Sequence, residues 1–125
     1  MVFDFFEKHS RLSWFIVVVG VVGIWIISSL IFLPSAFGIR FLPILYHILS
    51  FFLLTLFLLI ALIKGEKKYY LFLIGILLAV GYGALDEIHQ FFVPGRACTI
   101  FDVFLDGVGV VLASMVYMVR VLLKK

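Results

Sequence analysis

Charged residues are scarce in this sequence of 125 residues, because Asp, Glu, Lys and Arg make up 14% of it, against about 25% in ordinary soluble domains. Cysteine occurs once and proline three times, so a disulfide scaffold and a proline-rich fibrous chain are excluded. Hydrophobic residues make up 66% of the chain, and a chain this short cannot bury so many of them away from water. The composition therefore excludes a soluble domain and predicts one small integral membrane domain over residues 1–125.

Four stretches of the chain are long and apolar enough to cross a membrane, which takes about 20 residues of helix. Backbone groups in lipid must pair within their own segment, so each stretch is expected to be helical. A cleaved signal peptide is the rival interpretation of the first stretch, but its apolar run is too long and Asp4 and Glu7 do not suit a basic leader. We predict an all-α, four-helix membrane bundle with helices at about 14–33, 42–63, 69–90 and 99–123.

Lysine and arginine are distributed unevenly around these four stretches. Eight of the ten lie at the chain ends or in the connection 64–68, whereas Arg40 and Arg96 lie in the first and third connections. Because basic residues favour the cytoplasmic side, both termini are expected there, with Cys98 on the outer side. The net charge of +3 is explained by attraction to anionic lipid and requires no nucleic-acid partner. We expect a multi-pass protein of the cytoplasmic membrane.

Polar residues from all four stretches are predicted to meet near the outer surface. At 1.5 Å per residue, His47 lies about 25 Å and Asp106 about 21 Å above the inner boundary of their helices. Small residues at every fourth position of the third helix form a packing face that ends at Glu87. Ionisable groups inside apolar runs are costly and are candidates for function. The expected layer comprises His47, Asp86, Glu87, Gln90, Arg96, Asp102, Asp106 and Ser28.

Several of these residues also have structural explanations. The spacing of Thr99 and Asp102 is typical of a capping box at a helix start. Ser28 can bond to its own helix, and His89, on the other face of its helix from Glu87, is expected at the membrane interface. A divalent cation bound by three of the acids is an alternative to an ion pair with the nearby arginine. The ion pair is preferred, so we expect no metal and no cofactor.

The second half of the chain carries motifs of a known family. D-E-I-H-Q (86–90), P-G-R (94–96) and D-V-F-L-D (102–106), with Gly109 following, resemble the D-E-x-x-Q, P-G-R and D-V-x-x-N motifs of the VanZ-like family of small bacterial and archaeal membrane proteins. This chain has Asp106 where the family usually has asparagine, which adds a carboxylate near Asp102. The resemblance covers nearly the whole chain and implies action at the cell surface, since the family's namesake is associated with resistance to the lipoglycopeptide teicoplanin.

The favoured hypothesis is a protein that binds or acts on the headgroup of an envelope lipid or of a lipid-linked precursor. The fork of Arg96 can grip a phosphate through two hydrogen bonds, and a carboxylate or imidazole can move a proton. Whether turnover occurs is left open. The candidate catalytic residues are Glu87, Asp106 and His47, and the candidate binding residues are Arg96, Gln90, Asp102, Asp86 and Ser28.

Two other classes of function compete with this hypothesis. In one, the polar layer only locks the four helices together within a non-catalytic partner or assembly protein. In the other, the chain is a small transporter, but transport sites tend to lie near the bilayer midplane. The midplane is nearly all apolar here, so the transporter is the least favoured of the three.

Overall fold

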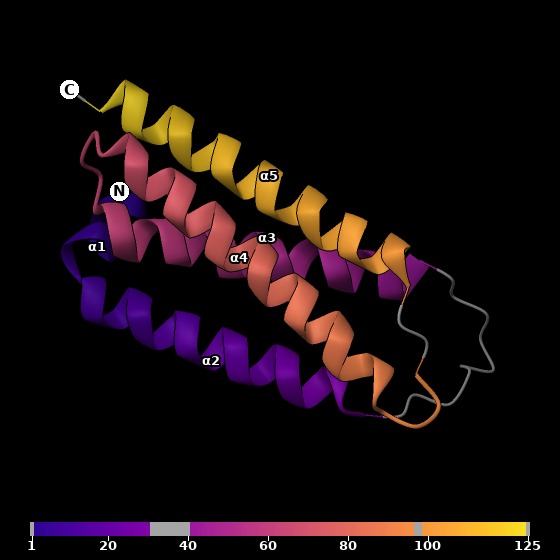
Figure 1. The fold of residues 1–125 in the computed structure, drawn as a ribbon. Helices are drawn as coiled ribbons and strands as arrows, with labels where there is room; N and C mark the ends of the chain where they lie inside the picture. Colours follow the sequence, from indigo (N-terminus) through magenta and orange to yellow (C-terminus); the bar gives the residue numbers. More distant parts are fainter. Residues whose placement is uncertain (1, 31–40, 97–98, 125) are drawn as a thin grey trace.

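The four apolar stretches all form helices in the computed structural model, which describes residues 2–30, 41–96 and 99–124 (Figure 1). The described elements, all helical, are α1 (Val2–Lys8), α2 (Ser10–Ser28), α3 (Phe41–Ile63), α4 (Tyr69–Phe91) and α5 (Ile100–Leu123). Each of α2 to α5 is long and apolar enough to cross a membrane. Their outward faces expose large apolar side chains, as a lipid environment requires. The predicted all-α, four-helix architecture is confirmed.

The helix bounds agree with the prediction to within one residue for α3, α4 and α5, whereas α2 differs at both ends. It begins at Ser10 instead of residue 14, and it ends at Ser28 instead of residue 33. The hydroxyls of Ser28 and Ser29 donate to the Trp25 carbonyl at 3.0 and 2.7 Å. They compete there with the backbone bonds of the last turn. The predicted break at Pro34 lies outside the described residues.

Helix α3 is the centre of the bundle, since it contacts all the other described helices. Figure 1 shows α2 and α5 at opposite edges with α3 and α4 between them, and α2 and α5 make no contact with each other within the described ranges. Phe51 and Leu59 of α3 are fully buried in the two halves of the core. Side chains of α3 therefore face protein over most of its length.

Small residues allow α4 and α5 to approach α3 closely. A Cβ atom at Gly75 would lie 2.6 Å from the Leu59 side chain, and one at Gly109 would lie 2.9 Å from the Phe52 backbone nitrogen and would also meet the Ile48 carbonyl. The Leu59 side chain can move aside at Gly75, but the backbone contacts at Gly109 exclude any larger residue unless the helices separate. The predicted small-residue face of the third helix is buried up to Glu87.

Helix α1 was not predicted. Its Phe3 and Phe6 pack against the half of the core that contains Tyr117, and the Ser13 hydroxyl donates to the Phe6 carbonyl at 2.9 Å. Helix α1, the turn between α3 and α4, and the end of α5 lie together at one end of the bundle, which we call the terminal end (Figure 1). The opposite end, where α2 and α4 end and α3 and α5 begin, is called the site end.

Candidate functional site

A histidine and an aspartate join α3 to α5 near the site end. His47 and Asp106 are 5% and 2% exposed, and His47 Nδ1 lies 2.8 Å from Asp106 Oδ1. The other ring nitrogen, Nε2, lies 3.9 Å from Asp102 Oδ1, one turn earlier on α5. The imidazole thus lies between two carboxylates. In the tautomer with Nδ1 protonated, an ionised Asp106 accepts a hydrogen bond from Nδ1–H and fixes the ring, so that Nε2 is available to accept a proton.

Helix α4 supplies two more carboxylates, and one glutamine bridges them. The Gln90 amide donates to Asp86 Oδ2 at 2.9 Å and to Glu87 Oε1 at 3.3 Å, because the three residues share one face over a single turn. The Gln90 carbonyl accepts from the Arg96 guanidinium at 3.0 Å. Gly95 has a φ of 80° at the turn that returns Arg96 to α4. The D-E-x-x-Q and P-G-R motifs therefore meet in space.

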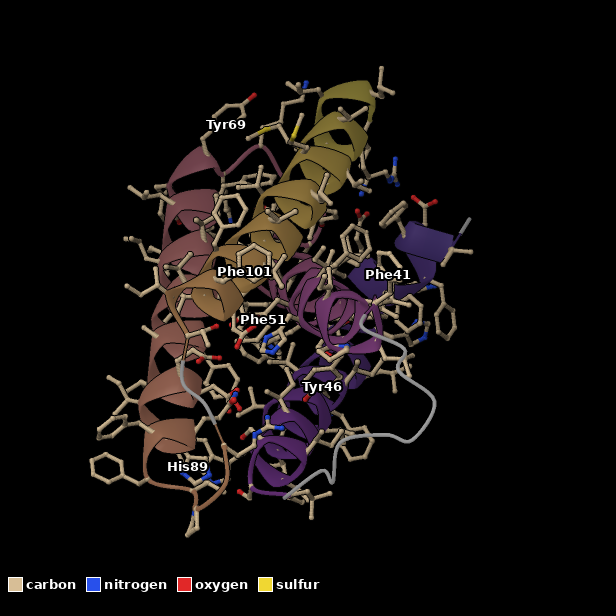
Figure 2. The ribbon with its side chains drawn as sticks, turned by 90° about the vertical axis from the view of Figure 1, so that its right-hand side faces the viewer. Phe41, Tyr46, Phe51, Tyr69, His89 and Phe101 are labelled. Atoms are coloured by element: carbon tan, nitrogen blue, oxygen red, sulfur yellow. The ribbon has the colours of Figure 1, made fainter. Side chains whose placement is uncertain are left out.

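These side chains form one group at the site end, which we call the polar cluster. Figure 2 views the bundle from that end and shows oxygen and nitrogen atoms gathered between α3, α4 and α5, near Phe51 and Tyr46. The Cα atoms of His47 and Asp106 lie about 9 Å inside the starts of α3 and α5, whereas Arg96 lies beyond the end of α4. The polar cluster comprises His47, Asp86, Glu87, Gln90, Arg96, Asp102 and Asp106.

The polar cluster has more buried acceptors than donors among the described residues. Asp86 Oδ1, Glu87 Oε2 and Asp106 Oδ2 are buried with no hydrogen-bond partner there. Buried polar groups are nearly always paired in native proteins, and an unpaired one costs about 1–3 kcal/mol. His47, Glu87 and Asp106 each offer one ligand atom within 4.8 Å of the others, so they are the residues that could hold a metal ion. The arrangement can accept protons or a cation.

Asp102 has two contacts that correspond to its two predicted roles. The Thr99 hydroxyl accepts from the Asp102 backbone nitrogen at 3.1 Å, which is the N-cap half of the predicted capping box. The Asp102 side chain, 21% exposed, faces His47 at the edge of the polar cluster. Capping thus fixes the first turn of α5, and this turn places a carboxylate beside the imidazole.

Ser28 is the one predicted site residue that no described hydrogen bond or ion pair joins to the polar cluster. It is buried, and its hydroxyl donates to its own helix. Its neighbour Ser29 instead lies 2.8 Å from His89 Nε2, and the His89 ring stacks on Trp25 with ring centres 3.9 Å apart. This contact ties α2 to α4 at the site end. A binding role for Ser28 stays a prediction.

An apolar groove of about 300 Å³ runs between α2 and α3. Its walls include Gly20 and Gly23 of α2, and its polar lining side chains are Tyr46 and Ser50 of α3. The Tyr46 ring packs edge-on against His47 with ring centres 5.5 Å apart, and its hydroxyl is buried without a hydrogen-bond partner among the described residues. Sequence reasoning missed Tyr46, although its place directly before His47 was the available signal.

A second polar group, also missed from the sequence, closes the terminal end. Glu7 of α1 is 6% exposed, and its carboxylate accepts from Lys124 Nζ at 2.5 Å and from the Tyr117 hydroxyl at 3.2 Å. The same hydroxyl accepts from the Gly65 backbone nitrogen at 2.9 Å. This network joins α1, the α3–α4 turn and α5, residues more than 50 positions apart in the chain.

Four helices long and apolar enough to span a membrane, with buried acids and a histidine at one end and a partly exposed arginine beside them, define a small multi-pass membrane protein. The chain belongs to the VanZ/LLP1 family, whose model matches residues 2–123. The resemblance seen in the sequence is thereby confirmed. Searches of curated proteins and of solved structures gave no match, so the roles of individual residues are argued from their geometry.

Proposed function

We propose that this protein binds the headgroup of an envelope lipid, or of a lipid-linked envelope precursor, at the outer face of the cytoplasmic membrane. The observation that carries the proposal is the polar cluster, buried within the site end of an otherwise apolar bundle. Ionisable residues inside membrane segments are expensive, and by default they indicate a functional site. The distribution of Lys and Arg supports an outward-facing site end.

Arg96 is the group best suited to a headgroup phosphate. It follows the helix end, it is partly exposed, and its hydrogen bond to Gln90 holds it beside the acids of α4. A guanidinium forms two parallel hydrogen bonds to a phosphate, and it therefore binds the phosphate more strongly and with a more defined geometry than a lysine ammonium does. The pair His47 and Asp106 lies deeper, where it can take up or release a proton from a bound headgroup.

The α2–α3 groove favours a lipid as the ligand over a water-soluble molecule. Its lining is almost entirely apolar, and it reaches Tyr46, the residue next to His47. On α2 the lining extends from Ile16 to Ile27, a distance of about 16 Å at helical rise. An acyl chain in this groove would leave its headgroup near the polar cluster.

Lipid retention by three variants tests the proposal. The protein is purified in detergent, and the lipids that remain bound are measured by mass spectrometry. We expect Arg96→Lys to lower retention at unchanged melting temperature, because Lys keeps the charge but loses the fork. Gly23→Leu fills the groove, since a Cβ atom at Gly23 meets nothing within 4 Å. It should also lower retention, whereas its matched control Gly81→Leu, on the exposed face of α4, should not.

The same variants distinguish binding from a purely structural role of the polar cluster. A cluster that only locks helices predicts a lower melting temperature for Arg96→Lys and lipid retention equal to that of the wild type in Gly23→Leu. That pair of results would refute the headgroup proposal. Expression in a teicoplanin-sensitive bacterium tests the link to resistance, for which we expect a gain with the wild-type protein and none with Arg96→Lys.

A further inference from the structure

The polar cluster carries more negative charge than its described basic groups can balance. Its carboxylates belong to Asp86, Glu87, Asp102 and Asp106. The groups opposite them in the cluster are the Arg96 guanidinium and the His47 imidazole. If all four carboxylates are ionised, a net negative charge remains even when the imidazole is protonated, and either protons or a bound cation must then balance it. Uncompensated charge is strongly unfavourable in an apolar interior, so a positive partner would stabilise the fold here.

Three carboxylate oxygen atoms of the polar cluster have no hydrogen-bond partner among the described residues. Asp86, Glu87 and Asp106 are each at most 2% exposed, and each has one buried oxygen without a hydrogen-bond partner among the described residues. Most buried carboxylate oxygens accept a hydrogen bond or coordinate a cation. Three such atoms from two helices therefore indicate a ligand that is itself a cation or a donor.

The donors of the cluster suit a metal ion. One nitrogen of His47 and one carboxylate oxygen each from Glu87 and Asp106 lie within 4.8 Å of one another, and they come from three different helices. Ligand atoms around a tetrahedral cation with bonds of 2.0–2.1 Å lie about 3.4 Å apart, so modest side-chain rotations would complete the set. Asp102 Oδ1, 3.9 Å from His47 Nε2, is placed to orient the ring from outside it.

We propose that His47, Glu87 and Asp106 bind a divalent cation, Zn²⁺ or Mn²⁺, at the site end. An imidazole nitrogen suits Zn²⁺, carboxylates suit Mn²⁺, and a mixed set accommodates either. From the sequence, an ion pair was preferred to a metal because three acids beside an arginine suit an ion pair as well as a cation. The proposal does not rest on lipid binding, although a cation would offset much of the negative charge that an anionic headgroup meets.

Metal binding by the purified protein, without added lipid, is the test. The protein in detergent is stripped with a chelator and titrated with Mn²⁺ and with Zn²⁺. We expect one saturable site per chain and a higher melting temperature with metal. Glu87→Gln and Asp106→Asn should weaken binding by more than about tenfold, the lower limit for groups that only support a ligand. The control Glu66→Gln removes an exposed carboxylate at the terminal end and should bind like the wild type.

Pulsed electron paramagnetic resonance on bound Mn²⁺ identifies the ligand without relying on the folding of the acid variants. We expect a nitrogen coupling from one imidazole in the wild type, its loss in His47→Gln and its retention in His89→Gln. Three results would each overturn the proposal: no saturable binding of either metal, bound Mn²⁺ without nitrogen coupling, or a coupling that survives His47→Gln. Failure of lipid retention alone would leave the metal site standing.

Discussion

Asp106 replaces the asparagine usual in VanZ-like sequences, and the structure places it against His47 with one oxygen bonded and one oxygen unpaired. The bonded oxygen needs only to accept, which an amide oxygen does equally well. The unpaired oxygen gains nothing from its charge unless a proton or a cation meets it. An aspartate at this position therefore suits a cation ligand better than the purely structural role that a neutral asparagine would fill.

Asp106→Asn is expected to leave the metal-free protein as stable as the wild type, to within about 1 kcal/mol, or more stable. The amide oxygen keeps the bond to His47, and a buried unpaired charge disappears. Melting in detergent with chelator measures this. His47→Ala removes the ring between two carboxylates and serves as the reference for a large loss of stability. A fall in melting temperature for Asp106→Asn as large as that of His47→Ala would contradict the expectation.

Helix α5 depends on one glycine for its approach to α3. At Gly109 a Cβ atom would meet the backbone of α3 at Ile48 and Phe52, and backbone cannot move aside as a flexible side chain does. The same approach carries Asp106, one turn earlier, to His47. The packing of two elements and the geometry of the polar cluster thus depend on the same residue.

Gly109→Ala is expected to destabilise the bundle by about 1–3 kcal/mol, the usual cost of overpacking. It should also weaken metal binding, since α5 must move away from α3. The matched control is Gly107→Ala on the same helix, where a Cβ atom meets nothing within 4 Å. Thermal melting of both variants measures the destabilisation. Equal melting temperatures would show that α3 and α5 can move apart at position 109 with no loss of stability.

Helix α1 is held against the terminal end of the bundle by the contacts of Glu7 with Lys124 and Tyr117. Glu7→Gln removes a buried carboxylate that accepts from Lys124 and Tyr117, which is expected to cost about 2 kcal/mol. Asp4→Asn is the matched control, because Asp4 is exposed and its pair with Arg120 is open to water. We expect a lower melting temperature for Glu7→Gln and an unchanged one for Asp4→Asn. Equal falls in melting temperature would show that the burial of Glu7 adds nothing to the stability of the fold.

The orientation of the whole molecule is a prediction from its charges. Helix α1 and the end of α5 lie at the same end of the bundle, and the excess of Lys and Arg at that end predicts that it faces the cytoplasm. Cys98 lies outside the described residues, but it is the only thiol in the chain and is expected on the outer side. A membrane-impermeant maleimide should label intact cells at Cys98, and labelling only after lysis would place the site end in the cytoplasm.

Much of this architecture follows from the sequence alone. Length, apolar runs and the pattern of small residues predicted four helices and the buried face of α4, because in lipid each helix satisfies its own backbone and local composition decides where it lies. The motif residues were also expected to converge, since rise along a helix converts position into depth. Helix α1 escaped prediction because its stability comes from Glu7 and two phenylalanines packed on helices far away in the chain.

Tertiary structure alone decided which polar groups touch. Rise and periodicity give the depth and face of a side chain, but they do not give the neighbour across a helix interface. The pairing of His47 with Asp106, the bridging of two acids by Gln90 and the engagement of Glu7 at the terminal end depend on which helices adjoin and how closely they pack. Glycine at position 109 sets that closeness for α3 and α5, and through it the polar cluster.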